Sequence, residues 1–145
     1  MDRSIGFLMG VTYRKLSNLL LQRLRNYDIT PEQWSVLHRI YEQEGTIQKD
    51  LALRSGKDKP TTTRILDTLE AKGLIKKQPD ASDRRSTLIF MSVKGSRLIA
   101  ETVSIEQQVI KDATAGISDE EHNLLIDLLL RIGDTISGIS DQQHE

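Results

Sequence analysis

Basic and hydroxyl side chains gather in the middle of this 145-residue chain, and these residue types suit contact with a polyanion. Residues 47–97 hold twelve Lys or Arg and six Asp or Glu, whereas the rest of the chain holds eight and fifteen. The net charge of −1 therefore hides a basic segment inside an acidic remainder, a pattern typical of nucleic-acid binding. With one Trp, three Tyr and two Phe, the chain is poorly supplied for stacking on single strands, so duplex DNA is favoured.

Within this segment, residues 59–72 are predicted to form a helix with one apolar and one polar face. At about 100° per residue, the apolar face carries Thr62, Ile65, Leu66 and Leu69, and the outward face carries Pro60, Thr63, Arg64, Asp67 and Thr68. Thr side chains suit base edges or phosphates, Arg can bind guanine through two hydrogen bonds, and a helix N-terminus attracts phosphate. The outward face therefore fits a reader of the major groove. The alternative is an ordinary solvated helix face.

A charged loop, residues 79–86, separates two predicted strands at 74–78 and 87–91. A hairpin that directly follows a helix-turn-helix can reach the flanking minor groove, where a narrow A·T tract favours inserted Arg. We expect Asp83 to hold Arg84 or Arg85 in a fixed direction rather than to contact DNA itself. The alternative is a hairpin tip that binds nothing.

The elements that position these residues follow from apolar periodicity and from capping residues. Helices are predicted at about 3–26, 31–45, 47–55, 59–72, 92–114 and 118–138, with a polar tail from Ser140 onward. Thr30 with Gln33, and Ser118 with Glu121, fit capping boxes, and Asp58 fits an N-cap. The expected fold class is mainly α with a small β-hairpin, a winged helix-turn-helix core with long helices at both ends.

The first and last helices are too apolar to face water on every side. The last one carries Leu or Ile at positions 124, 125, 126, 128, 129, 130, 132 and 136. We expect these helices, with the fifth, to intertwine with a second copy, which would set two recognition helices roughly 34 to 36 Å apart, one turn of DNA. The alternative is that they wrap a single monomeric core.

Four segments resemble the MarR family of winged-helix transcription regulators. They are Asp50-Leu51-Ala52, Lys59-Pro60-Thr61-Thr62-Thr63-Arg64, Leu69-Glu70-Ala71-Lys72-Gly73-Leu74-Ile75 and Asp83-Arg84-Arg85. The resemblance is dense over residues 31–97, and one departure follows it, Met91-Ser92 in place of the usual Leu-Thr. It implies a DNA-binding domain at 31–97 between dimerisation helices at 1–30 and 98–145.

The resemblance also implies a function and its residues. It implies a homodimer, a repressor in most cases, that binds a pseudo-palindromic operator of double-stranded DNA. It puts Lys59, Pro60, Thr61, Thr62, Thr63 and Arg64 at the major groove, with the wing pair Asp83 and Arg85 and the neighbouring Arg84 at the minor groove. Family members are often released by a small aromatic or anionic effector, for which Tyr13, Arg14, Trp34 and His38 could line a pocket. Trp34 has the spacing of a core residue, and His38 fits a surface residue equally well.

Other classes of function find less support in the sequence. The absence of Cys excludes disulfides and thiolate sites and favours a reducing cytoplasm, and no segment suits a membrane span. His38, His122 and His144 lie too far apart in the chain to predict a zinc site, and no cofactor is expected. An enzyme acting on nucleic acid would need clustered carboxylates, but Asp67 and Glu70 are better explained as ion partners of Arg64 and Lys77. A winged-helix module that binds proteins remains the alternative to a DNA-binding regulator.

Overall fold

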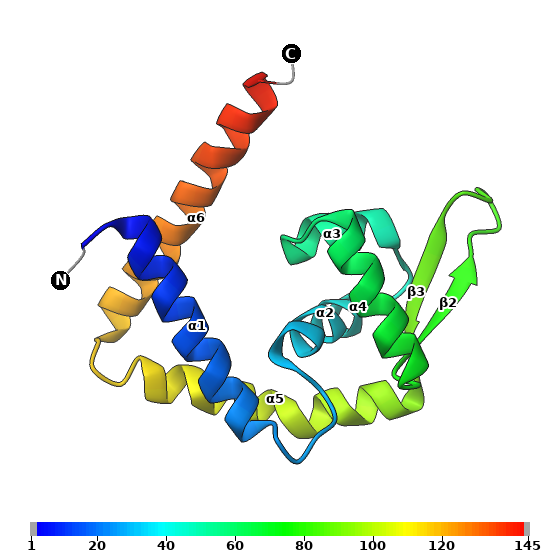
Figure 1. Ribbon diagram of the computed structural model, residues 1–145, viewed down its shortest axis with the longest axis horizontal. Coiled ribbons are helices and arrows are strands. Elements are labelled where there is room, and N and C mark those ends of the chain that lie inside the picture. The colour runs from blue at the N-terminus through cyan, green and yellow to red at the C-terminus, as the bar shows by residue number, and fades with distance from the viewer. Residues whose placement is uncertain (1–2, 144–145) are drawn as a thin grey trace. The chain divides into compact units, whose positions relative to one another are not determined.

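The computed structural model describes residues 3–143, which form six helices and a small sheet (Figure 1). The elements are α1 (Ile5–Arg23), α2 (Pro31–Glu42), β1 (Thr46–Ile47), α3 (Gln48–Ser55), α4 (Lys59–Ala71), β2 (Ile75–Pro79), β3 (Thr87–Met91), α5 (Val93–Ala113) and α6 (Asp119–Gln143). Among the described residues, no helix combines the length and the apolar character needed to cross a membrane. The mainly helical fold class with a small hairpin is confirmed.

The chain divides into two compact units, residues 1–109 and residues 110–145. The first unit contains α1 to α4, the sheet and most of α5, and the second contains the end of α5 and α6. In the first unit, α2 packs against both α3 and α4, and α4 packs against β2. The core of this unit consists of Leu24, Ile29, Trp34, Val36, Leu37, Ile40, Leu51, Ile65, Leu66, Leu69, Leu74, Ile75, Ile89, Met91 and Ile99.

The helix starts are set by local hydrogen bonds, as the capping residues predicted. The backbone amide of Gln33 donates to Oγ1 of Thr30, and the amide of Thr30 donates to Oε1 of Gln33, each at 3.2 Å. The same exchange joins Ser118 and Glu121 at the start of α6. These side chains satisfy amide groups that have no partner inside a helix, so they define where α2 and α6 begin.

Two helix ends differ from the sequence-based prediction. Helix α2 stops at Glu42, before Gly45, because the chain turns at this Gly (φ 76°) into the short strand β1. Helix α6 continues to Gln143 rather than ending near Gly138, and the polar tail from Ser140 to that residue is helical. Gly138 has no positive φ, so it does not terminate the helix as a left-handed Gly does.

The sheet is antiparallel with the order β1-β3-β2, so β3 is its central strand. Strand β1 was not predicted. Its Thr46 and Ile47 pair with Ile89 and Leu88, while β2 pairs with β3 from Ile75 opposite Met91 to Pro79 opposite Thr87. The sheet therefore joins the entrance of the helix-turn-helix to the wing.

Helix α5 is tied to the base of the wing through its first turn. The hydroxyl of Ser92 donates to the carbonyl oxygen of Gly73 at 2.6 Å and accepts from the amide of Gly95 at 2.9 Å. A Cβ on Gly95 would lie 2.0 Å from the carbonyl oxygen of Leu74, so only Gly fits there. Ser92 thus caps α5 as predicted despite the Met91-Ser92 departure.

Candidate nucleic-acid interface

Helix α4 begins at a strong cap that leaves its N-terminal turn open to solvent. Oδ1 of Asp58 accepts a hydrogen bond of 2.7 Å from the backbone amide of Thr61, and Pro60 occupies the first turn. Hydrogen bonds from the backbone and the side chain of Thr61, with a smaller contribution from the charge of Arg64, lower the pKa of Asp58. The carboxylate is therefore held in its charged form, in which it caps the helix most strongly.

The two faces of α4 are those that the periodicity predicted. Ile65, Leu66 and Leu69 are buried in the core, and Pro60, Thr63, Arg64 and Asp67 are exposed. The outward face thus presents small, hydroxylic and cationic groups from its N-terminal half. Its chemistry suits the acceptor groups of a major groove and the phosphates beside it.

Thr62 does not belong to this interface, which corrects the role that the resemblance implied for it. The side chain is only 1% exposed, and its hydroxyl donates to the carbonyl oxygen of Asp58 at 2.8 Å. The helical periodicity had placed Thr62 on the apolar face, and the structure agrees with the periodicity. A buried side chain on the inner face of the helix cannot contact a base or a phosphate.

Arg64, an exposed cation of α4, has an acidic partner in another helix. Nη2 of Arg64 lies 3.2 Å from Oε1 of Glu32, in the first turn of α2. The expectation that Asp67 or Glu70 pairs with Arg64 is wrong, since both pair with Lys77 of β2, at 2.5 and 3.8 Å. Lys77 was predicted as a partner and is confirmed, and it neutralises carboxylates that would otherwise repel phosphate.

The wing loop is closed by its own hydrogen bonds. The amide of Asp80 donates to the carbonyl oxygen of Ser86 at 3.0 Å, and Ser82 donates to the Asp80 carboxylate from both its amide and its hydroxyl. These donors lower the pKa of Asp80. The loop is thus a defined turn that presents its basic residues at the tip of the hairpin (Figure 1).

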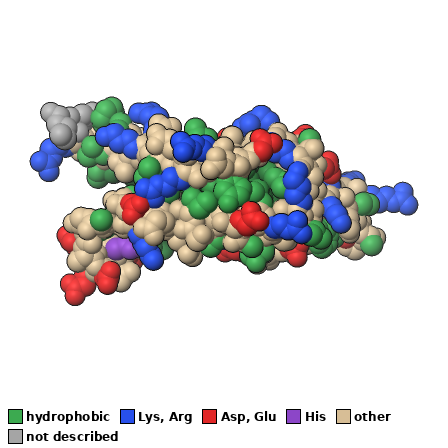
Figure 2. Space-filling model, turned by 90° about the horizontal axis from the view of Figure 1, so that it is seen from below, with side chains coloured by type: hydrophobic (Ala, Val, Ile, Leu, Met, Phe, Trp, Pro, Cys, Tyr) green, Lys and Arg blue, Asp and Glu red, His purple; other side chains and the backbone are tan. Residues whose placement is uncertain are grey.

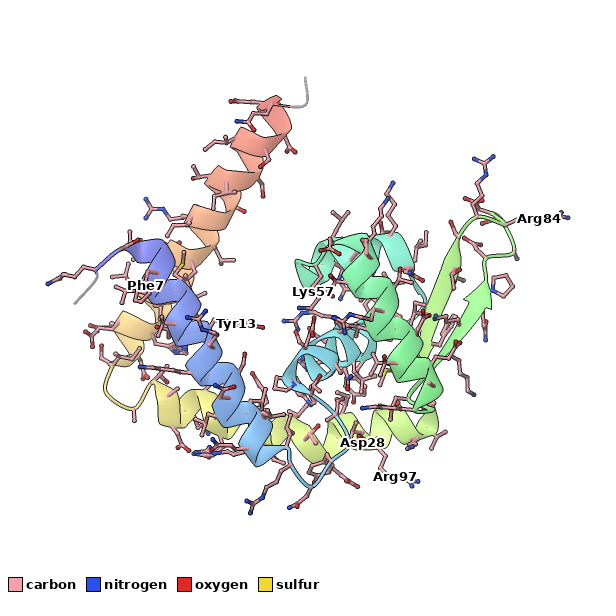
Figure 3. The ribbon with its side chains drawn as sticks, in the orientation of Figure 1. Phe7, Tyr13, Asp28, Lys57, Arg84 and Arg97 are labelled. Atoms are coloured by element: carbon pink, nitrogen blue, oxygen red, sulfur yellow. The ribbon has the colours of Figure 1, made fainter. Side chains whose placement is uncertain are left out.

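Asp83 orders the wing through the backbone. Its Oδ1 accepts a hydrogen bond of 2.9 Å from the amide of Arg85, and its Oδ2 accepts from the hydroxyl of Ser86. Among residues 3–143, its carboxylate forms no ion pair with the guanidinium of Arg84 or Arg85, which corrects the expectation of a fixed side-chain pair. Both Arg side chains are exposed, and Figure 3 shows Arg84 extending away from the loop.

A hollow of about 710 Å³ lies between α3, the start of α4 and the wing. Its lining contains three cations and two carboxylates beside polar groups: Lys49, Lys59, Arg85, Asp50, Asp83, Gln48 and Thr63. Sequence reasoning missed Gln48 and Lys49, although their place in the basic segment at the first turn of a predicted helix was a usable signal. The structure thus brings the two basic elements together around one concave surface.

The four residues predicted for an effector lie in different surroundings. Trp34 is 5% exposed in the core, where its Nε1 donates to Oγ1 of Thr102 at 2.7 Å, and His38 stacks on its ring. Tyr13 instead lines a cavity of about 580 Å³ whose wall contains neither Trp34, His38 nor Arg14. Of the four residues, Tyr13 lines this cavity, and the burial of Trp34 in the core argues against a pocket that all four share.

The Tyr13 cavity has a basic side that reaches the α4 face. Besides Tyr13 of α1, its wall includes Glu32 of α2, Lys57 of the turn before α4, and Arg64. Figure 3 shows the side chains of Tyr13 and Lys57 pointing into the space between their elements.

The described residues provide no metal site. Residues 3–143 contain no group of three or more His, Cys, Asp or Glu suited to an ion, and His144 lies outside them.

Comparison with known proteins finds a similarity to one protein family. The model of the MarR family matches residues 29–87, which span the helix-turn-helix and the wing loop. Over these residues the chain is similar to the MarR family. This family consists of DNA-binding transcription regulators rather than enzymes.

Solved structures agree over nearly the whole length of the chain. The transcriptional regulator SlyA superposes with a TM-score of 0.86 at 28% identity, over 93% of this chain and 95% of that one. MepR of S. aureus, in a complex with DNA, gives 0.85 at 26% identity, over 92% and 99%. A mutant MarR of E. coli, in a complex with operator DNA, gives 0.82 at 26% identity, over 88% and 92%.

Proposed function

We propose that this protein is a MarR-family regulator, a dimeric, sequence-specific repressor that binds a pseudo-palindromic operator. Helix α4 would lie in the major groove, and the wing at residues 79–86 would reach the minor groove. The observation that carries the proposal is the concave basic surface formed by α3, the α4 N-terminus and the wing, with exposed hydrogen-bonding side chains at its centre. MepR and the E. coli MarR mutant, which share this fold, were both solved with DNA.

The roles of individual residues follow from where their polar groups point. Thr63 and Arg64 would read base edges, because they are exposed on the outward face of α4. Pro60 and Thr61 would lie against the groove at the helix N-terminus, where backbone amides and Lys59 favour phosphate. Arg84 and Arg85 would enter the minor groove, with Asp83 shaping their loop.

The dimer proposal rests on apolar side chains that each unit leaves exposed. Six large apolar residues of α1 are exposed, Ile5, Phe7, Leu8, Met9, Tyr13 and Leu21. On α6 nine are exposed, Leu124, Leu125, Ile126, Leu128, Leu129, Leu130, Ile132, Ile136 and Ile139. Figure 2 shows hydrophobic side chains lying open on one face of the molecule, among Lys and Arg. Such patches mark interfaces, and the symmetry of an operator calls for a second copy of the chain.

The dimer is tested by an apolar-to-charged substitution. Leu129→Glu should shift the sedimenting species to a monomer at micromolar concentration and weaken operator binding, because a charge would be buried in the interface. Leu53→Glu is the matched control for sedimentation, since Leu53 is 75% exposed on α3, outside the helices proposed to dimerise. A stable monomer of the unaltered chain at that concentration contradicts the dimer.

For the effector, the Tyr13 cavity replaces the pocket first expected. A small anionic aromatic molecule there would meet Lys57 and Arg64, and so would draw a groove-reading side chain away from DNA. Isothermal calorimetry with salicylate tests this. The site is supported if salicylate binds and if Tyr13→Ala and Lys57→Ala each weaken that binding. The site is ruled out if salicylate gives no heat of binding and does not change the affinity for DNA.

The DNA-binding proposal is tested by selection from random duplexes, followed by titration at several salt concentrations. A two-fold symmetric motif is expected, with affinity that falls steeply as salt rises. Arg64→Ala should cost about 1 to 3 kcal/mol and relax base preference, whereas Arg84→Ala should weaken all duplexes alike. Arg97→Ala is a charge-matched control, since Arg97 lies on α5, away from the wing (Figure 3).

Equal and weak binding to every duplex contradicts the proposal. A module that binds proteins through this surface would need an apolar patch on α4 or the wing. Among the described residues, no large hydrophobic side chain of α4 or of the 79–86 loop is exposed. That alternative is therefore not favoured by the surface itself.

A further inference from the structure

Four threonines lie on α4, and three of them use their hydroxyl protons within the protein. Thr61 hydrogen-bonds to the carboxylate of Asp58 through its side chain. Thr62 donates to the carbonyl oxygen of Asp58 at 2.8 Å, and Thr68 donates to the carbonyl oxygen of Arg64 at 3.1 Å. These protons cannot serve a ligand without breaking a bond that the protein already has.

Thr63 differs from the other three. Its Oγ1 accepts a hydrogen bond of 2.9 Å from Nε2 of Gln48, the first residue of α3. Within residues 3–143, no acceptor takes the hydroxyl proton of Thr63. The side chain of Thr63 is exposed, and both residues line the basic hollow described above.

A threonine hydroxyl has one proton to donate and two lone pairs that accept. When the Gln48 amide donates to the oxygen of Thr63, it occupies a lone pair and repels the hydroxyl proton from its own side. The proton is left to point out of the hollow. Gln48 therefore determines whether Thr63 acts as a hydrogen-bond donor or acceptor toward a molecule bound on this surface.

We propose that Gln48 is a positioning residue that turns Thr63 into a hydrogen-bond donor, so that the pair selects a base with an acceptor at one operator position. This inference rests on the proposed DNA-binding function and specifies one of its contacts. In the major groove guanine offers N7 and O6 and thymine offers O4, whereas cytosine offers only the N4 amine, a donor. Guanine or thymine should therefore be favoured over cytosine opposite Thr63.

The experiment uses the full chain and the operator that it selects from random duplexes. Each base pair of one half-site is replaced in turn, and affinities are measured for the unaltered chain and for Thr63→Val, which keeps the shape but removes the hydroxyl. The position that Thr63 reads is the one where Thr63→Val loses discrimination. There the unaltered chain should favour guanine or thymine over cytosine roughly three- to tenfold, as one hydrogen bond provides.

Two substitutions of Gln48 then test whether it sets the direction in which the Thr63 hydroxyl donates, or only contacts Thr63. Gln48→Glu can only accept from Thr63, so the threonine proton turns inward and its lone pairs face the DNA. Discrimination at that position should reverse toward cytosine. Gln48→Ala leaves the hydroxyl free to rotate, so discrimination should shrink to less than about twofold without reversing.

Gln78→Glu controls for the added negative charge, because Gln78 is exposed on strand β2 of the same unit and lies outside the hollow. It should lower overall affinity at most, with the base preference unchanged. Circular dichroism melting of each variant verifies that it folds.

The outcomes distinguish this inference from the proposed function. An unaltered chain that selects no motif overturns both. A chain that selects its operator while the Gln48 variants keep the same preference overturns only the role of Gln48. A uniform loss with Thr63→Val, at every sequence alike, assigns Thr63 to a phosphate and overturns base selection by the pair.

Discussion

The ion pair between Glu32 and Arg64 predicts that the chain restrains a side chain that we propose reads DNA. Their charged atoms lie 3.2 Å apart, with 40% and 61% of the two side chains exposed. A guanine would take two parallel donors of Arg64, for which the side chain must turn away from Glu32 on α2, so we expect DNA binding to break the pair. Removing the carboxylate by Glu32→Gln should therefore raise operator affinity.

The size of the gain follows from the exposure of the pair. Ion pairs as open to water as this one contribute about 0.2 to 1 kcal/mol. Removing the competition should thus strengthen operator binding roughly 1.4- to 5-fold, since about 1.4 kcal/mol corresponds to a factor of ten. Glu32→Gln also removes an acidic group from the first turn of α2, which should cost about 0.3 to 1 kcal/mol of folding stability.

A double-mutant cycle separates this gain from the general effect of removing a negative charge. Operator affinity is measured by fluorescence anisotropy for the unaltered chain, Glu32→Gln, Arg64→Ala and the double variant. The gain should disappear in the Arg64→Ala background. Asp50→Asn, an exposed residue of α3, removes the same charge and should show the same small effect with or without Arg64. A gain from Glu32→Gln that persists without Arg64 refutes the competition.

Three further predictions concern the scaffold. Gly95→Ala should destabilise the fold by about 3 kcal/mol in urea unfolding, because its Cβ would lie 2.0 Å from the carbonyl oxygen of Leu74. Trp34→Phe should cost about 1 to 2 kcal/mol in the same assay, since the buried hydrogen bond of its Nε1 to Thr102 is lost. Hydrogen bonds from the backbone and hydroxyl of Ser118 hold the pKa of Glu121 below 4.5, so its stabilisation is present above that pH and is lost as the pH falls through the lower folded value. The excess Tm of the unaltered chain over Glu121→Gln should therefore vanish in acid.

Each of these predictions has an outcome that contradicts it. Gly116→Ala adds a Cβ with no atom within 4 Å, so an equal loss at Gly116 and Gly95 would argue against a clash. If Trp34→Phe leaves the free energy of unfolding unchanged, the buried hydrogen bond makes no net contribution to stability. A Tm difference at Glu121 that is the same at neutral and acid pH shows that its charge is not responsible.

Features that depend on neighbours in the chain could be predicted from the sequence. The caps at Thr30, Asp58 and Ser118 were correct, because each side chain bonds to an amide three residues away. The burial of Ile65 and Thr62 followed from the helical repeat. The helical repeat was also the better guide for Thr62, which the motif comparison alone would have placed in the groove.

Features that depend on distant segments could not be predicted. Strand β1 consists of two residues and exists only because Thr46 meets Ile89 of β3, so no local repeat indicates it. Arg64 pairs with Glu32 rather than with an acid on its own helix because the packing of α2 against α4 brings them together. The separation of Tyr13 from Trp34 likewise depends on tertiary packing, since the indole is directed toward Thr102 of α5.

The strand order leaves the outer side of β2 without a neighbouring strand, and its residues bear on the behaviour of the concentrated protein. An open strand edge can recruit another chain into a growing sheet. If the β2 strands of two chains paired, the positive charges of Lys76 and Lys77 in one chain would repel those in the other. Pro79 also has no amide hydrogen to donate to a neighbouring strand. These residues disfavour edge-to-edge pairing, so we expect the hairpin to stay unpaired in concentrated solution.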